Sequence, residues 1–181
     1  GGTSPRPGKP PDHGPEASKD AVAGACRRAR GAKVAGRRTS LDQRAAAMLR
    51  FHDLVLDRQD EIIDLIVWES GKARKHALDE VLSATAATRH YAHASRGYIR
   101  TRRRRGVLPV LTKVTETRVP KGAVGIITPW NYPLALAVSD VIPALIAGNG
   151  VVHKPDTQTA LTGLRLRELA VQAGLPEDLW Q

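Results

Sequence analysis

The most constraining feature of the sequence is the stretch from Gly125 to Thr157, which alternates between strand, helix and strand patterns. The apolar run from Ala123 to Thr128 is typical of a parallel strand that is buried on both faces. A polar corner follows, and Pro133 stands where proline favours the first turn of a helix. That helix leads to a second apolar strand, which ends at Lys154 and Pro155. We therefore predict a βαβ unit.

Two polar clusters follow the strands of this unit. Trp130 and Asn131 come after the first strand, and the segment from Lys154 to Thr157 ends the second. Ligands of open α/β sheets bind outside the carboxyl ends of the strands. The sequence therefore predicts that pocket residues gather at one edge of the sheet.

These clusters belong to longer motifs. Pro129-Trp130-Asn131-Tyr132-Pro133 precedes Pro143-Ala144-Leu145-Ile146-Ala147-Gly148-Asn149 and Lys154-Pro155, while Glu69-Ser70-Gly71-Lys72 lies upstream and Gly174-Leu175-Pro176 downstream. In these motifs and their spacing, residues 20–181 resemble the aldehyde dehydrogenase superfamily. The segment that begins at Lys154 is most similar to bacterial NADP-dependent succinate-semialdehyde dehydrogenases.

The resemblance implies an α/β protein with a partial aldehyde-dehydrogenase fold: amino-terminal helices, a β flap and an incomplete Rossmann-like parallel sheet. We expect a disordered tail at residues 1–19 and the helical part of the cofactor domain at 20–100. The β flap is expected at 101–121, and the first βαβα part of the cofactor domain at 122–181. In the family the flap joins subunits into oligomers, whereas the residues alone also fit a plain surface hairpin.

The resemblance also implies the oxidation of an aldehyde, with succinate semialdehyde as the expected substrate, to its carboxylic acid. Members of the family use a cysteine nucleophile and a glutamate base, which lie beyond the last residue of this chain. Cys26 is its only cysteine, and it has no catalytic counterpart in the family. We expect the amino-terminal portion of such an enzyme to be inactive alone. An alternative is a non-catalytic subunit that joins a full-length relative through its flap.

Asn131 is the candidate catalytic residue, because its matching position in the family donates a hydrogen bond to the developing oxyanion. A plain helix cap is the alternative, since asparagine is favoured there. The resemblance implies that cofactor contacts come from both corners, at Ile127, Pro129, Trp130, Asn131, Lys154, Pro155, Asp156 and Thr157.

Thr157 bears on the choice of cofactor. The matching lysine of the family, here Lys154, binds the adenosine ribose, and NAD-preferring members commonly carry a glutamate at the position of Thr157. A neutral hydroxyl removes the negative charge that would repel a 2′-phosphate. We therefore predict NADP as the cofactor, with NAD as the alternative.

Composition raises an alternative from another class. Lysines and arginines number 28 against 18 acidic residues, and Arg102 to Arg105 form a continuous basic run, as in proteins that bind nucleic acid. Only 4% of the residues are aromatic, however, and no nucleic-acid-binding motif accompanies the run. We favour a solvated connection. No apolar run is long enough for a membrane span, and the start does not resemble a signal peptide, so we expect a cytoplasmic protein.

The first part of the chain reads as helices. One is predicted near residues 20–33, and a capping box of Ser40 and Gln43 begins a long second helix that runs to Gly71. A third is expected at residues 73–95, with Gly97 near its end, and residues 107–120 favour β structure.

Histidines offer a weak metal hypothesis. His90 and His93 have the i, i+3 spacing that could place two imidazoles on one ion, but no cysteine or carboxylate pair completes a site. We predict no metal site. His153 interrupts the second apolar strand, and we expect it to be buried and uncharged.

Overall fold

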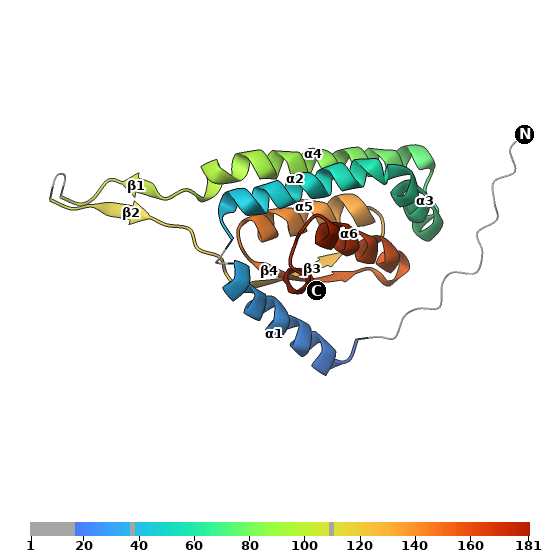
Figure 1. The fold of residues 1–181 in the computed structure, drawn as a ribbon, viewed down its shortest axis with the longest axis horizontal. Helices are drawn as coiled ribbons and strands as arrows, with labels where there is room; N and C mark the ends of the chain where they lie inside the picture. Colours follow the sequence, from blue (N-terminus) through green and yellow to red (C-terminus); the bar gives the residue numbers. More distant parts are fainter. Residues whose placement is uncertain (1–16, 37–38, 109–110) are drawn as a thin grey trace, which may run out of the picture.

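The computed structural model of the protein describes residues 17–36, 39–108 and 111–181, and Figure 1 shows them as layers of helices around a small parallel sheet. The expected tail at residues 1–19 lies mostly outside the described residues, and the first helix begins at Lys19. In chain order the elements are α1 (Lys19–Gly36), α2 (Leu41–Asp57), α3 (Gln59–Ser70), α4 (Arg74–Ile99), β1 (Arg102–Arg104), β2 (Val114–Glu116), β3 (Ala123–Thr128), α5 (Pro133–Ile146), β4 (Gly150–Pro155), the 3-10 turn η1 (Thr157–Thr159), α6 (Ala160–Gln172) and the 3-10 turn η2 (Glu177–Leu179).

The predicted βαβ unit is confirmed. β3 and β4 pair in parallel from Ala123 opposite Gly150 to Thr128 opposite Pro155, and α5 connects them. A further parallel bridge joins Val151 to Trp180 on the other side of β4. The backbone at Trp180 therefore lies beside β4 as a short addition to the sheet.

α5 lies at the centre of the core. Its side chains are buried almost all round, because α5 packs on the sheet with one face and on α2 and α4 with the other. This explains why its sequence is apolar except at Ser139 and Asp140. The buried residues of α5 are Pro133, Leu134, Ala137, Val138, Val141, Ile142, Leu145 and Ile146.

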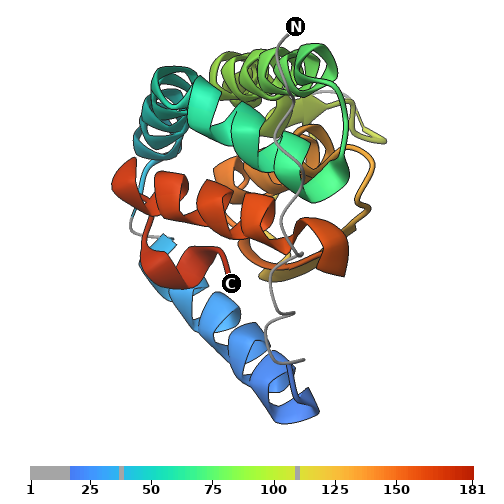
Figure 2. The same ribbon diagram turned by 90° about the vertical axis from the view of Figure 1, so that its right-hand side faces the viewer.

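The opposite face of the sheet is covered in part by α1, which lies on the other side of β3 and β4 from α5 (Figure 1). In Figure 2, α6 lies between α3 and α1. A side chain at Gly150 would meet the backbone of α1, since a Cβ placed there would come 2.3 Å from the carbonyl oxygen of Ala29. Glycine is thus required for this close approach.

Two helix predictions need correction. The single helix expected between Ser40 and Gly71 is two helices, α2 and α3, separated at Arg58, where the backbone leaves helical geometry with φ −107° and ψ 20°. The change of direction lets α3 pack against both α4 and α6. α4 also ends later than the expected Ser95, because it continues through Gly97 to Ile99.

The segment after α4 is an antiparallel hairpin that projects from the body of the molecule (Figure 1). β1 is formed by the first three arginines of the basic run, and it pairs with β2, where Arg104 forms an ion pair with Glu116. Regular β structure is shorter than predicted, because among the described residues of the expected stretch it includes only 114–116. Residues 109–110 lie outside the described residues.

Candidate functional site

The carboxyl ends of β3 and β4 lie side by side, as the sequence predicted. Ile127 is opposite Lys154 in the parallel register, and Thr128 is opposite Pro155. Side chains at paired positions point to the same face of a sheet, and both Ile127 and Lys154 are exposed. The two polar corners therefore leave the sheet at the same edge, beside an open strip of its surface.

The corner after β3 presents Asn131 to solvent. Trp130, Asn131 and Tyr132 are all exposed there, although Pro133 directly after them is buried in the first turn of α5. In the part of the chain that the structure describes, the Asn131 side-chain amide makes no hydrogen bond. The helix-cap alternative for Asn131 is wrong, because the N-cap residue is Tyr132 and it provides no side-chain bond.

The first turn of α5 is instead capped from another helix. Glu80, on α4, accepts hydrogen bonds through Oε2 from the amides of Leu134 at 3.0 Å and Ala135 at 3.2 Å. Its other oxygen, Oε1, pairs with the ammonium of Lys72. A carboxylate at this point is favourable, since the free amides and the helix dipole make the start of a helix electropositive.

Lys72 links this buried carboxylate to the polar corner. Its Nζ donates to the backbone carbonyl of Asn131 at 2.6 Å and lies 4.4 Å from the centre of the Tyr132 ring. The ring face attracts the cation. Gly71, with φ 70°, ends α3 in the left-handed conformation just before Lys72.

The corner after β4 is organised in a similar way. Asp156 caps the η1 turn by accepting from the amide of Gln158 at 3.0 Å, and Thr157 follows it as an exposed residue. Lys154 is also exposed, and among the described residues its ammonium has one hydrogen-bond partner, the neighbouring carbonyl of Pro155 at 3.2 Å. The positive charge of Lys154 is thus available to a ligand at the carboxyl edge of the sheet.

The start of α6 has its own carboxylate cap. Glu69, at the end of α3, accepts from the amides of Leu161 at 2.7 Å and Thr162 at 2.8 Å, and from the Thr162 hydroxyl at 2.6 Å. The N-termini of α5 and α6 are therefore both filled by acidic side chains from the α3–α4 region. A helix N-terminus otherwise offers its amides to phosphate, so neither of these two can serve as a phosphate cradle.

Sequence reasoning missed the roles of Glu69, Lys72 and Glu80. The sequence indicates Glu69 and Lys72 only as members of the Glu69-Ser70-Gly71-Lys72 motif. Glu80 had a detectable signal, because it lies on the inward stripe of α4 between the buried residues Ala77 and Ala84. A carboxylate in such a stripe needs a partner.

His153 lies on β4 near the same edge and is half-buried, with its ring 5.9 Å from that of Trp180. Its Nε2 and the hydroxyl of Thr128 are 2.9 Å apart. Burial lowers the pKa of His153 from 6.5 to about 4, so the imidazole is neutral at neutral pH. The imidazole is uncharged as expected, but His153 is half-buried and not buried as predicted.

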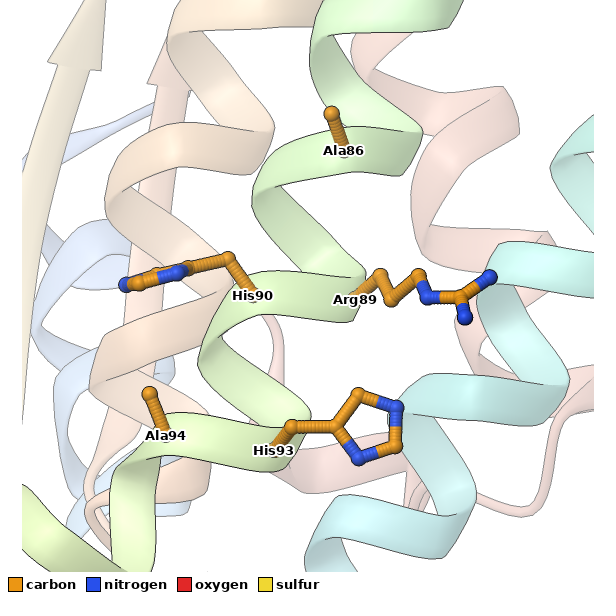
Figure 3. A pocket seen from close by; sticks show the side chains of 5 residues that line it. All are labelled: Ala86, Arg89, His90, His93 and Ala94. Atoms are coloured by element: carbon orange, nitrogen blue, oxygen red, sulfur yellow. The ribbon is translucent and has the colours of Figure 1, made fainter.

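His90 and His93 are not arranged to bind one metal ion. Their side chains point to different sides of α4 in Figure 3, and His90 Nε2 is 3.1 Å from the Tyr98 hydroxyl. They line an open hollow of ≈ 530 Å³ together with Ala86, Arg89 and Ala94. Within the described ranges no group of three or more histidine, cysteine, aspartate or glutamate residues could hold a metal ion. Among the helices of the same ranges, none is both long and apolar enough to cross a membrane.

Comparisons with known proteins identify several relatives of the chain. A provisionally named NADP(+)-dependent succinate-semialdehyde dehydrogenase of Mycolicibacterium smegmatis is 43% identical over 92% of this chain and 32% of its own length. The crystal structure of an NAD-dependent aldehyde dehydrogenase from Sinorhizobium meliloti superposes with a TM-score of 0.85 at 35% identity, over 92% of this chain and 33% of that one.

The crystal structure of succinate-semialdehyde dehydrogenase from Burkholderia pseudomallei gives a TM-score of 0.83 at 28% identity, over 89% of this chain and 33% of that one. The chain thus spans about a third of the length of these relatives and has the corresponding part of their fold. The sequence model of the aldehyde dehydrogenase family matches residues 2–181. The chain therefore belongs to the aldehyde dehydrogenase family.

Proposed function

We propose that the chain provides the first part of the cofactor-binding domain of an NADP-linked aldehyde dehydrogenase that oxidises succinate semialdehyde to succinate. The observation that carries the proposal is the parallel register of β3 and β4, which brings the Asn131 and Lys154 corners to one edge. The name of the M. smegmatis relative supports the substrate and the cofactor.

Asn131 is proposed as an oxyanion donor. Its amide is exposed and makes no hydrogen bond with other described residues, so it is available to a substrate oxygen. A neutral amide can stabilise the negative charge that develops on the aldehyde oxygen without giving up a proton. Loss of one such donor typically costs about 3 kcal/mol of transition-state stabilisation.

The chemistry of the complete reaction needs groups besides Asn131. In the complete enzyme, loss of a hydride to a bound NADP would convert the adduct of a thiolate and the aldehyde into a thioester, and water would hydrolyse that thioester to the acid and the free thiol. Cys26 is half-buried in α1 and has no part in the proposed site. We accordingly expect the isolated 181-residue chain to show no aldehyde-dependent reduction of NADP.

Lys154 and Thr157 are proposed to bind the adenosine ribose and to admit its 2′-phosphate. The ammonium of Lys154 supplies a positive charge, and Thr157 supplies a hydroxyl without a negative one. The nearby carboxylate of Asp156 is held by the amide of Gln158. Ile127, Pro129, Trp130 and Pro155 complete the proposed contacts, with Ile127 and Trp130 offering exposed apolar surface.

The cofactor proposal is tested in a chimera in which this chain replaces the matching third of the M. smegmatis relative. We expect kcat/KM to be higher with NADP than with NAD, and Thr157→Glu to lower the value for NADP by about tenfold or more through charge repulsion. Thr157→Gln is the matched control of similar size without the charge, and it should retain most of the preference. A parent chimera that prefers NAD would overturn this proposal.

The β1–β2 hairpin is proposed to join subunits. It projects from the body of the molecule (Figure 1), and between its strands Val107 and Leu111 are 95% and 82% exposed, while Val119, just after β2, is 73% exposed. Exposed apolar groups on a two-stranded hairpin favour a contact with another chain, since such a hairpin is marginal by itself. This feature also supports the alternative of a non-catalytic subunit.

The two roles of the hairpin are separated by purification. A homo-oligomer of the isolated chain that is lost on Leu111→Asp supports self-association. Co-purification of the chain with a full-length relative, without activity of its own, supports the non-catalytic role. A soluble monomer that binds neither a second copy of the chain nor a full-length relative would contradict both roles of the hairpin.

A further inference from the structure

The environment of Glu80 is unusual for a carboxylate. Its side chain is fully buried, with 0% of its surface exposed, and it lies among apolar residues of α4 and α5. Its two oxygens have different partners: Oε1 pairs with Lys72, and Oε2 accepts hydrogen bonds from the amides of Leu134 and Ala135. A buried charge persists only where it is paired and hydrogen-bonded, and here both conditions are met.

Lys72 is fixed from several directions at once. Its side chain is only 15% exposed, and its ammonium reaches Glu80, the carbonyl of Asn131 and the face of the Tyr132 ring. Two of these three partners belong to the polar corner after β3. The corner has no cap of its own, since Tyr132 makes no side-chain bond to the helix. Lys72 and Glu80 therefore hold both the backbone before α5 and the first turn of α5.

We propose that Lys72 and Glu80 form a positioning pair that sets the backbone at Asn131, so that the Asn131 amide points at the reacting oxygen. This inference rests on the proposed function of Asn131. Neither residue of the pair touches the substrate in this account. Lys72 acts by holding the Asn131 carbonyl, and Glu80 acts by holding Lys72 and the start of α5.

The pair is expected to affect the rate of chemistry more than cofactor binding. A donor displaced by about an ångström loses most of its effect on a transition state, which corresponds to a loss in kcat of up to about a hundredfold. The Lys154 and Thr157 corner is held separately, through Glu69 and Asp156, so it should remain in place.

A double-mutant cycle in the chimera with the M. smegmatis relative tests the pair. We expect Lys72→Met to lower kcat by about 10- to 100-fold with the KM for NADP changed less than about twofold, and Asn131→Ala to lower kcat at least as much. If Lys72 acts through Asn131, Lys72→Met should cost almost nothing further in the Asn131→Ala background. Lys72→Arg keeps the positive charge and the donors, so it should recover part of the loss.

Lys75→Met is the matched control, because Lys75 is an exposed lysine in the first turn of α4. It should leave kcat unchanged. Fully multiplicative losses from Lys72→Met and Asn131→Ala would overturn the positioning proposal while leaving the role of Asn131 intact. An Asn131→Ala chimera with unchanged kcat would instead overturn the proposed function of Asn131.

A measurement on the 181-residue chain needs no activity. Lys72→Met should speed amide hydrogen exchange at Leu134 and Ala135 by about tenfold or more, because their acceptor loses its cation, whereas the buried helical amide of Val55 in α2 should be unaffected. Unchanged exchange at both α5 amides would contradict the proposed pair even if the chimera does not fold. Equal acceleration at Val55 would also contradict it, because the effect would then be general loss of stability.

Discussion

The half-buried histidine of β4 makes the stability of this chain depend on pH in a way that one substitution can remove. Burial lowers the pKa of His153 to about 4 from an ordinary value of 6.5. Between these values the unfolded chain binds a proton that the folded chain excludes, so acid favours unfolding. This stability is fully present above about pH 6.5 and is lost as the pH falls toward about 4.

The magnitude follows from the two pKa values. Proton linkage at a single site gives a decrease of about 2 kcal/mol in the free energy of unfolding between about pH 8 and about pH 5. With a typical urea dependence of about 2 kcal/mol per molar, the unfolding midpoint should fall by about 1 M over this interval. His153→Val should remove most of that decrease, although loss of the contact with Thr128 costs about 1 kcal/mol at either pH.

Urea unfolding of the parent, His153→Val and Thr128→Val at the two pH values provides the assay. Thr128→Val removes the hydrogen-bond partner but leaves the imidazole buried, so it should keep the pH-dependent decrease of the parent. A His153→Val variant whose midpoint falls as far as that of the parent would refute the assignment to His153. A Thr128→Val variant that loses the decrease would show that the hydrogen bond, and not burial, is the cause.

Two further substitutions test how the edge and the layers are held. Glu69→Ala should lower the free energy of unfolding by about 2 kcal/mol, because it leaves two amides of α6 and the Thr162 hydroxyl without their acceptor. Glu69→Gln should lower it less. Equal urea midpoints for Glu69→Ala and the parent would contradict the capping role of Glu69. Gly150→Ala should lower the free energy of unfolding by about 1 to 3 kcal/mol, because the added methyl group pushes α1 away from β4. Faster proteolysis within α1 is a second readout. A variant as stable and as resistant to proteolysis as the parent would show that the contact between α1 and Gly150 is not tight.

The local features of the fold could be predicted from the sequence. The bounds of β3 follow from an uninterrupted apolar run, and the capping box at Ser40 and Gln43 makes both of its expected bonds, at 2.7 and 3.1 Å. Gly174 follows the end of α6 with φ 94°, the left-handed conformation in which a glycine commonly ends a helix. Each of these features depends on neighbouring residues, which the sequence shows directly.

The features that sequence reasoning missed depend on distant partners. The break at Arg58 has no glycine or proline to mark it, and it arises because α3 packs on α4 and α6. The helix caps made by Glu69 and Glu80 join residues 92 and 54 positions apart, counted from Leu161 and Leu134. Without the fold, Glu69 cannot be told from other helix-surface acids, and the position of Glu80 in an apolar stripe predicts that it has a partner without identifying that partner. The two corners of the candidate site could be predicted, but the residues that hold them could not.

The most direct test of the account is a crystal structure of the chimera with NADP bound. We expect the adenosine ribose at the carboxyl edge of β3 and β4, with its hydroxyl or 2′-phosphate oxygens within hydrogen-bond distance of Lys154 Nζ and Thr157. The N-termini of α5 and α6 should remain occupied by Glu80 and Glu69. A dinucleotide bound at the opposite edge, near Gly150, or one whose phosphates displace either carboxylate, would contradict the central claim.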